Sequence, residues 1–311
     1  MSDLTRTTMR TTPLPSAVGG VERPDDRLDD LLGDLRAERL GAPPLLALDS
    51  DTYARDHAAF EARSDQRTLI AEHLTTRLAD RGAGPLSVLS VGCGDGTLDR
   101  VLASGLVCED DAASTGRPVR YVGVDPYASG TAAFSAALAE LDSPDLSVET
   151  SPTTWADAEV VGPFDVITFV HSMYYVPDVA AAVRQALALL RPGGELVVLS
   201  GPRGAMNALV DVCAPPLEGH RQWFSDDVAA GIRAAAGGPS YDVLPVETLQ
   251  ALCSLGSATP DVLDFTVQAR LTPAARALVL SYLDAVSVLH PVTGEPRVPH
   301  PVDVHRVRRL R

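Results

Sequence analysis

Lysine is absent from this chain, and all 26 of its basic residues are arginine. Its absence excludes a Walker-type phosphate loop, Schiff-base catalysis and a lysine general base. Apolar runs are short: none approaches the roughly 20 residues of a membrane-spanning helix, which argues against an integral membrane protein. The N-terminus lacks the apolar core that is typical of a secretory signal, so we expect a cytoplasmic protein.

Cysteines are few and widely spaced, at positions 93, 108, 213 and 253. They form no Cys-x-x-Cys pair and no histidine has the spacing of a zinc ligand, so we predict reduced thiols and no metal site. Positive charge is also scarce, because 41 acidic residues against 26 basic ones give a net charge of -15. Such a charge repels phosphate backbones and argues against nucleic-acid binding.

The chain divides into three parts by composition and periodicity. Residues 1–25 are rich in Thr, Ser, Gly and Pro, which predicts a disordered tail. Residues 26–82 carry apolar side chains at helical spacing, which predicts a helical N-terminal extension. In the third part, residues 83–311, short apolar strands alternate with helices; the expected strands are 85–91, 120–124, 146–149, 164–170 and 195–200, and the expected helices are 97–106, 131–141 and 179–190. This alternation predicts a Rossmann-like, doubly wound α/β fold around a parallel sheet.

The pattern is looser after the fifth expected strand. We expect an insertion over about 202–260 that contains a helix from Ser225 to near Gly237. Two further helices are expected at about 259–270 and 273–289. A last strand, starting at Val302, is expected at the edge of the sheet.

The most informative motif is Ser90-Val91-Gly92-Cys93-Gly94-Asp95-Gly96-Thr97, at the turn from the first strand into a helix. Glycines there let the backbone approach a ligand, and the helix N-terminus presents free N–H groups. The dinucleotide fingerprint needs a third glycine at position 97, which is Thr, so a nicotinamide dehydrogenase is the weakest hypothesis. The second strand ends at Asp125-Pro126, where a carboxylate can accept both hydroxyls of a ribose.

With Arg191-Pro192-Gly193-Gly194 before the fifth strand, these motifs resemble the class I S-adenosylmethionine-dependent methyltransferases over roughly residues 85–201. Within that class, Tyr53-x-x-x-His57-x-x-Phe60-x-x-x-Ser64, Met173-Tyr174-Tyr175 and Ser225-Asp226-Asp227 resemble histamine N-methyltransferase. Bacterial methyltransferases that act on indoles and other natural products share the general layout. The resemblance implies a mostly parallel, seven-stranded sheet, a helical lid over 26–82, a helical substrate-binding insertion and S-adenosyl-L-methionine as cofactor.

The resemblance also implies site residues. The cofactor site would be built at the carboxyl ends of the strands from Gly92, Cys93, Gly94, Gly96, Asp125, Pro126, Ser151, Trp155, Val170 and His171. The acceptor pocket would contain Tyr53, His57, Phe60, Gln66, Tyr174, Tyr175 and His220. Gln66 stands where the histamine family has a glutamate that pairs with the substrate's amine, and Ala205 and Leu209 stand at its pocket tryptophans. Histamine itself is therefore disfavoured as the substrate.

The acceptor atom is open on this basis. A neutral amine needs only alignment with the sulfonium methyl, whereas a phenol, indole or imidazole benefits from a base with a pKa near 7. His171 and His57 are the candidate bases. We expect N-methylation of a small, aromatic, nitrogen-containing metabolite in secondary metabolism, and the enzyme to be a monomer or homodimer. Two alternatives keep the cofactor chemistry: C-methylation of an indole, such as a tryptophan-derived cyclic dipeptide, and O-methylation with a histidine base. A third alternative is an inert regulator that binds the cofactor.

Overall fold

The computed structural model describes residues 24–41, 50–82, 84–107, 117–217 and 220–311. The expected disordered tail lies almost entirely outside these residues. None of the helices within them is long and apolar enough to cross a membrane.

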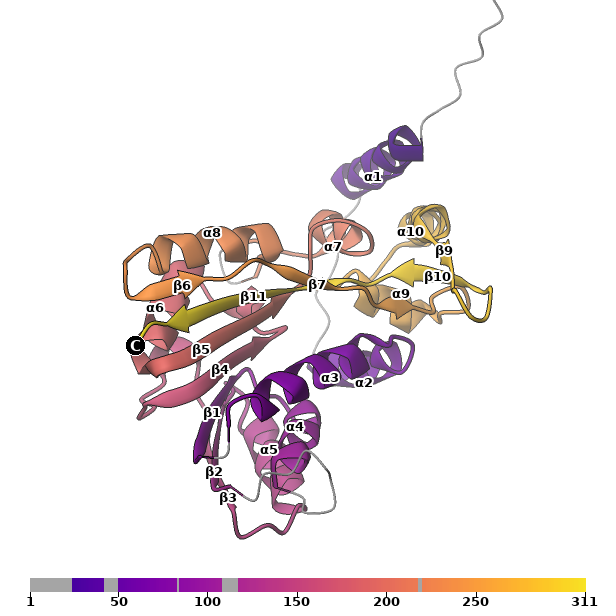
Figure 1. The fold of residues 1–311 in the computed structure, drawn as a ribbon. Coiled ribbons are helices and arrows are strands. Elements are labelled where there is room, and N and C mark those ends of the chain that lie inside the picture. The colour runs from indigo at the N-terminus through magenta and orange to yellow at the C-terminus, as the bar shows by residue number, and fades with distance from the viewer. Residues whose placement is uncertain (1–23, 42–49, 83, 108–116, 218–219) are drawn as a thin grey trace, which may run out of the picture.

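A single large sheet organises the chain (Figure 1). Its strands run in the order β3-β2-β1-β4-β5-β11-β6, and β7 pairs with a second stretch of β11. Their bounds are β1 Leu86–Val91, β2 Val119–Val124, β3 Leu146–Ser151, β4 Phe164–Val170, β5 Leu190–Ser200, β6 Tyr241–Val243, β7 Glu247–Leu249 and β11 Val302–Arg309. The first five strands are parallel, and β11 is antiparallel to β5. The predicted Rossmann-like, mostly parallel sheet is confirmed.

Helices cover both faces of this sheet, because its central strands are apolar on both sides. All six residues of β1 are buried. On one face lie α3 Gln66–Ala79, α4 Thr97–Val107 and α5 Ala128–Ala139, and on the other lie α6 Val179–Leu189 and α8 Ser225–Ala235. The helices predicted at 97–106, 131–141 and 179–190 therefore exist and have the doubly wound arrangement.

The last predicted strand exists, but its predicted place at the sheet edge is wrong. β11 lies between β5 on one side and β6 and β7 on the other. Its apolar residues Val302, Val304 and Val307 are fully buried, as in an interior strand. β6 and β7 have only three residues each, too few for an alternating pattern to indicate a strand.

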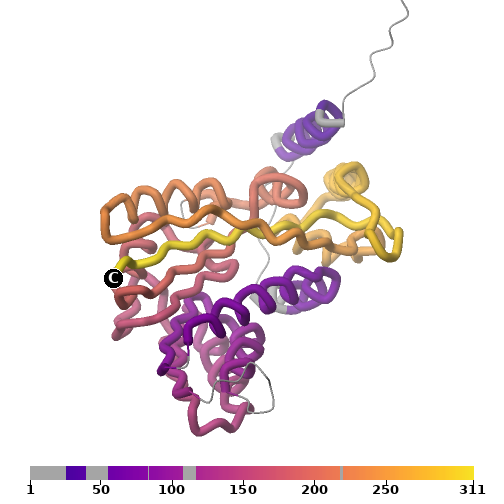
Figure 2. Tube along the Cα trace, in the orientation of Figure 1, coloured from indigo at the N-terminus to yellow at the C-terminus, as the bar shows by residue number. Residues whose placement is uncertain are grey.

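A second core lies beyond the carboxyl end of the sheet. It joins α1 Pro24–Gly41 to α7 Asn207–Cys213, α9 Pro260–Thr266 and α10 Pro273–Val286, with Leu35 of α1 almost fully buried. Figure 2 shows the indigo helix α1 near the yellow helix α10, and the two are in contact. A small sheet of β8 Leu252–Cys253, β9 Val288–Leu289 and β10 Pro296–Pro299 completes this layer.

The segment 202–260, expected as a helical insertion, has mixed structure. It contains α7 and α8 but also β6, β7 and β8. Part of it, α8 with β6 and β7, belongs to the large sheet and its helical cover. The remainder joins the second core, beside α2 Ser50–Glu61, whose contacts are with α9.

Candidate active site

The Gly-rich turn and the acid after β2 form one hydrogen-bonded unit at the carboxyl end of the sheet. The Asp125 carboxylate accepts the Gly94 N–H at 3.0 Å through Oδ2 and the Tyr127 N–H at 3.0 Å through Oδ1. The backbone N–H groups of Gly92 and Cys93 both donate to the Val124 carbonyl. The two motifs predicted from sequence are thus linked, and Asp125 supports the turn.

Gly94 marks the open side of this turn. Its φ is +54°, in the left-handed region that favours glycine, and no atom lies within 4 Å of the position that a Cβ would occupy. A backbone with that conformation and that free space suits a ligand that approaches the main chain closely. Each Asp125 oxygen also keeps a lone pair for a hydroxyl. The turn and the acid therefore fit the methionine and ribose parts of S-adenosylmethionine.

Replacing Asp125 with alanine is expected to weaken cofactor binding by about 1–3 kcal/mol, because a charge-assisted hydrogen bond to the ribose is lost. Binding of S-adenosylhomocysteine by calorimetry measures this change. Asp95→Ala is the matched control, since Asp95 is exposed and, within the described part of the chain, its carboxylate accepts only the Thr97 N–H at the start of α4. Unchanged affinity in a folded Asp125→Ala protein, or an equal loss in Asp95→Ala, contradicts the assignment.

His171 follows β4 directly and is the centre of a polar cluster. Its φ of +51° is unusual for a residue with a side chain. Its Nε2 lies 2.7 Å from Gln66 Oε1, and its Nδ1 is hydrogen-bonded to the Tyr174 hydroxyl. The Gln66 Nε2 in turn donates to the His300 carbonyl at 2.7 Å, and the His300 Nδ1 lies 2.8 Å from Ser64 Oγ. The start of α3, the end of β4 and the link between β10 and β11 thus meet here.

The structure brings several predicted acceptor residues to this cluster. The Phe60 ring packs edge-on against His300 at 5.3 Å between centroids. The Nε2 atom of His57 lies 3.2 Å from Glu61 Oε1, and Glu61 also pairs with Arg67. The centroid of the His57 ring is 5.5 Å from that of Phe265. The side chain of Tyr53, on α2, lies outside the described residues.

Sequence reasoning found Ser64 only as part of the family motif and placed no function on it or on His300. Their contacts join positions more than 230 residues apart. No local pattern indicates such a pairing, and only the order of strands and helices creates it. His220, predicted for the pocket, stacks instead on Trp223 at 5.0 Å and contacts the Arg221 carbonyl, so none of its described contacts reaches the cluster. Tyr175 is 53% exposed and packs against Tyr174.

Trp155, one of the predicted cofactor residues, has most of its side chain in the core. The indole is buried, packs edge-on against Phe169 and donates its N–H to the Ala182 carbonyl at 3.1 Å. It therefore fills the core between the sheet and α6, a role that its place after a strand did not indicate. Any cofactor contact must come from its small exposed edge.

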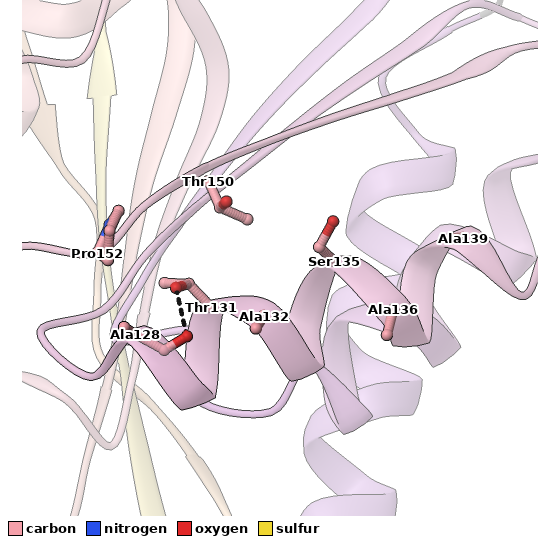
Figure 3. Close-up of a pocket in the computed structure, with 8 residues that line it drawn as sticks. All are labelled: Ala128, Thr131, Ala132, Ser135, Ala136, Ala139, Thr150 and Pro152. Atoms are coloured by element: carbon pink, nitrogen blue, oxygen red, sulfur yellow. Dashed lines mark hydrogen bonds between the residues drawn. The ribbon is translucent and has the colours of Figure 1, made fainter.

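A shallow groove of about 570 Å³ lies between α5 and β3 (Figure 3). Small side chains line it: Ala128, Thr131, Ala132, Ser135, Ala136, Ala139, Thr150 and Pro152. Pro152 directly follows Ser151, and Ala128 begins the helix after Asp125, so one end of the groove adjoins the predicted cofactor residues. The His171 cluster is not part of it. Among the described residues, no group of three His, Cys, Asp or Glu side chains could hold a metal.

Burial makes the cluster sensitive to acid. It lowers the pKa of His171 to about 3 and that of His300 to about 4, from 6.5. The native state therefore binds fewer protons than the unfolded chain below pH 6.5, and stability is lost as the pH falls. Asp99 acts in the opposite sense, because burial raises its pKa from 3.8 to about 6. Stability from this carboxyl falls as the pH rises from about 4 to 6.

The two histidines outweigh the single carboxyl, so we expect the free energy of unfolding to drop by about 1–3 kcal/mol between pH 6.5 and 4.5. Urea denaturation at the two pH values measures the drop. His171→Gln should reduce it, because glutamine does not titrate. His220→Gln, outside the cluster, should show the same drop in the free energy of unfolding as the parent protein. An undiminished drop in His171→Gln would show that burial of His171 does not cause the acid sensitivity.

The parallel sheet, the Gly-rich turn and the acid after β2 define a class I methyltransferase fold with a cofactor site at its carboxyl end. A family model described as a methyltransferase domain matches residues 62–230, more than half of the chain, and the chain belongs to this family. The predicted class, an S-adenosylmethionine-dependent methyltransferase, is confirmed. The finer resemblance to histamine N-methyltransferase stays a prediction.

Curated relatives match only part of the chain. A ubiquinone biosynthesis O-methyltransferase from Nitrobacter winogradskyi is 33% identical over 111 residues, which are 36% of this chain and 37% of that protein. A protein of the same name from Bradyrhizobium sp. is 32% identical over 113 residues, 36% of this chain and 39% of that protein. The chain thus matches less than half the length of these relatives.

Solved structures share the fold over more of the chain. A protein from Bacillus halodurans C-125 has a TM-score of 0.52 at 12% identity, over 77% of this chain and 98% of that one. The plantazolicin methyltransferase BpumL, determined in complex with SAH, has a TM-score of 0.50 at 12% identity, over 93% and 99% of the two chains. At such identities the likeness concerns the fold.

Proposed function

We propose that this protein transfers the methyl group of S-adenosyl-L-methionine to a nitrogen of a small, aromatic metabolite. The observation that carries the choice of nitrogen is the state of His171. Both of its ring nitrogens are hydrogen-bonded, and burial lowers its pKa to about 3. A base with a pKa near 7 is therefore not supplied at the end of β4, and an acceptor that needs only alignment suits the site better than one that must be deprotonated.

The chain's own residues would bind and orient the two reactants. Gly94 and Asp125 would hold the cofactor, which supplies an already activated methyl group. The cluster around His171 would form one wall of the acceptor pocket, under the predicted lid of residues 26–82. Exclusion of water from that pocket would favour a transfer in which the positive charge moves from sulfur to nitrogen rather than being created.

O-methylation is the second candidate. It is supported by the names of the two curated relatives, which are O-methyltransferases. The base would then be His57, which is partly exposed and lies beside Glu61. C-methylation of an indole would need the same base, and an inert cofactor-binding regulator would need none. We propose a monomer or homodimer that acts in the cytoplasm on a small molecule.

Two measurements test the proposal. Calorimetry with S-adenosylhomocysteine should detect binding; its absence would overturn the cofactor assignment. S-adenosylhomocysteine formation should then be followed with aromatic amines, imidazoles, indoles and phenols. Turnover of amines or imidazoles supports N-methylation, turnover of phenols alone supports the second candidate, and binding without any turnover across the panel favours the inert regulator.

A further inference from the structure

We propose that the Tyr174 hydroxyl, rather than His171, contacts the acceptor, and that the acceptor nitrogen carries a hydrogen. Gln66 is then a positioning residue, which acts through His171. This inference rests on the proposed N-methylation and deepens it. The direction of each hydrogen bond in the cluster supports it.

The orientation of the Gln66 amide follows from its partner on the β10–β11 link. The His300 carbonyl can only accept a hydrogen bond, so the Gln66 atom 2.7 Å from it must be the NH₂ group. Gln66 is buried, and its backbone N–H is also held, by Ser64 Oγ at 3.2 Å. The amide is thus fixed with its oxygen toward His171.

That oxygen determines the tautomer of His171. Gln66 Oε1 can only accept, so the imidazole nitrogen 2.7 Å away, Nε2, must carry the hydrogen. A neutral imidazole has one N–H, which leaves Nδ1 as an acceptor. The Tyr174 hydroxyl must therefore donate its hydrogen to Nδ1. The hydrogen bonds therefore run in one direction, from Tyr174 to His171 and from His171 to Gln66.

This direction leaves the Tyr174 oxygen as an acceptor. Its hydrogen points at His171, and a lone pair of the oxygen can accept a hydrogen bond from a ligand. Tyr174 is partly exposed and lies just beyond the carboxyl end of β4, where open α/β sheets bind their ligands. A ligand that meets this atom needs to be a donor, such as a primary or secondary amine.

The chemical step follows from that contact. The acceptor N–H donates to the Tyr174 oxygen, which aims the nitrogen lone pair at the methyl carbon. The N–C bond forms while the C–S bond breaks, and the electron pair of the broken bond stays on sulfur as a thioether. The methylated nitrogen then carries the positive charge and releases its proton to water.

The first test needs no acceptor. Nitrogen-15 NMR of labelled histidine at pH 7, assigned with His171→Gln, should show hydrogen on Nε2 of His171 and a bare Nδ1. Gln66→Leu should abolish this preference, whereas Gln66→Glu should keep it, because a carboxylate oxygen also accepts. Hydrogen on Nδ1 in the parent protein, or an unaltered tautomer in Gln66→Leu, would overturn the proposal even if methyl transfer is observed.

The second test uses an aromatic secondary amine and its N-methylated, tertiary analogue as acceptors. Tyr174→Phe should lower kcat/KM by about 10-fold for the secondary amine and by less than about 2-fold for the tertiary one, which has no hydrogen to donate. Tyr241→Phe is the control, since its hydroxyl contacts the Leu187 carbonyl on the far side of the sheet from α3. Equal losses for the two amines in Tyr174→Phe would overturn the proposed contact. If neither amine is turned over while the NMR result holds, N-methylation fails and the hydrogen-bond direction stands.

Discussion

Replacing Gly92 with alanine is expected to lower the free energy of unfolding by roughly 2–5 kcal/mol. The backbone of Gly92 has a φ of +71°, and an added Cβ would lie 2.2 Å from the Cβ of Ser172. The Ser172 side chain cannot move away easily, because its hydroxyl donates a hydrogen bond to the Val91 carbonyl at 2.6 Å. The strain of the left-handed backbone and the steric overlap therefore add. Urea denaturation without cofactor measures the loss.

Gly94→Ala separates stability from binding within the same turn. Its φ is also positive, but its Cβ would meet open space, so the loss of stability should be only about 1 kcal/mol. The new methyl group would instead project into the proposed cofactor site and weaken S-adenosylhomocysteine binding. Equal destabilisation by the two substitutions would show that contact with Ser172 is not what requires glycine at position 92.

His171→Ala is expected to lower kcat/KM for the acceptor by about 10-fold, as Tyr174→Phe does, while cofactor affinity changes little. The substitution removes the acceptor of the Tyr174 hydrogen bond and leaves the Gln66 oxygen without its partner. Steady-state kinetics with an acceptor from the panel and calorimetry with S-adenosylhomocysteine measure the two quantities. A parallel loss of cofactor affinity would mean that the substitution disturbs the Gly-rich turn.

The pH dependence of the rate distinguishes a histidine that acts as a general base from one that only positions Tyr174. A general base of ordinary pKa would produce a rate limb near pH 6 to 7, which is what the sequence predicts for His171. Burial lowers the pKa of this residue to about 3, so we expect no such limb from it. A limb near pH 6 to 7 that disappears in His57→Gln would identify His57 as a base and favour O- or C-methylation.

The cofactor half of the site could be predicted from the sequence because its motifs are local. Gly92 to Gly96 and Asp125 each follow a strand, and parallel neighbouring strands bring their carboxyl ends to one edge. The acceptor half could be predicted only in part. His171 and Gln66 were predicted as site residues, but the hydrogen bond from Gln66 to the His300 carbonyl depends on the path of the chain after β10.

Two further features could not be predicted, for physical reasons. The position of Trp155 after β3 did not indicate its burial, because the direction of a side chain in a loop depends on the core below it, which here accepts the indole. The resemblance implied seven strands, but the positions of β6 and β7 were not indicated by the sequence. Pairing with β11 stabilises β6 and β7, and their own three-residue sequences carry no comparable signal.

The interior position of β11 has a consequence for how the molecule folds. His305 pairs with Val198, more than one hundred residues earlier in the chain. During synthesis the hydrogen-bonding edge of β5 therefore stays uncovered until this distant strand emerges, and closing so long a loop is slow. An apolar strand with an open edge can pair with other chains in that interval. We expect aggregation during expression to respond most strongly to substitutions in β11, and co-expressed chaperones that bind exposed strands to raise the yield of folded protein.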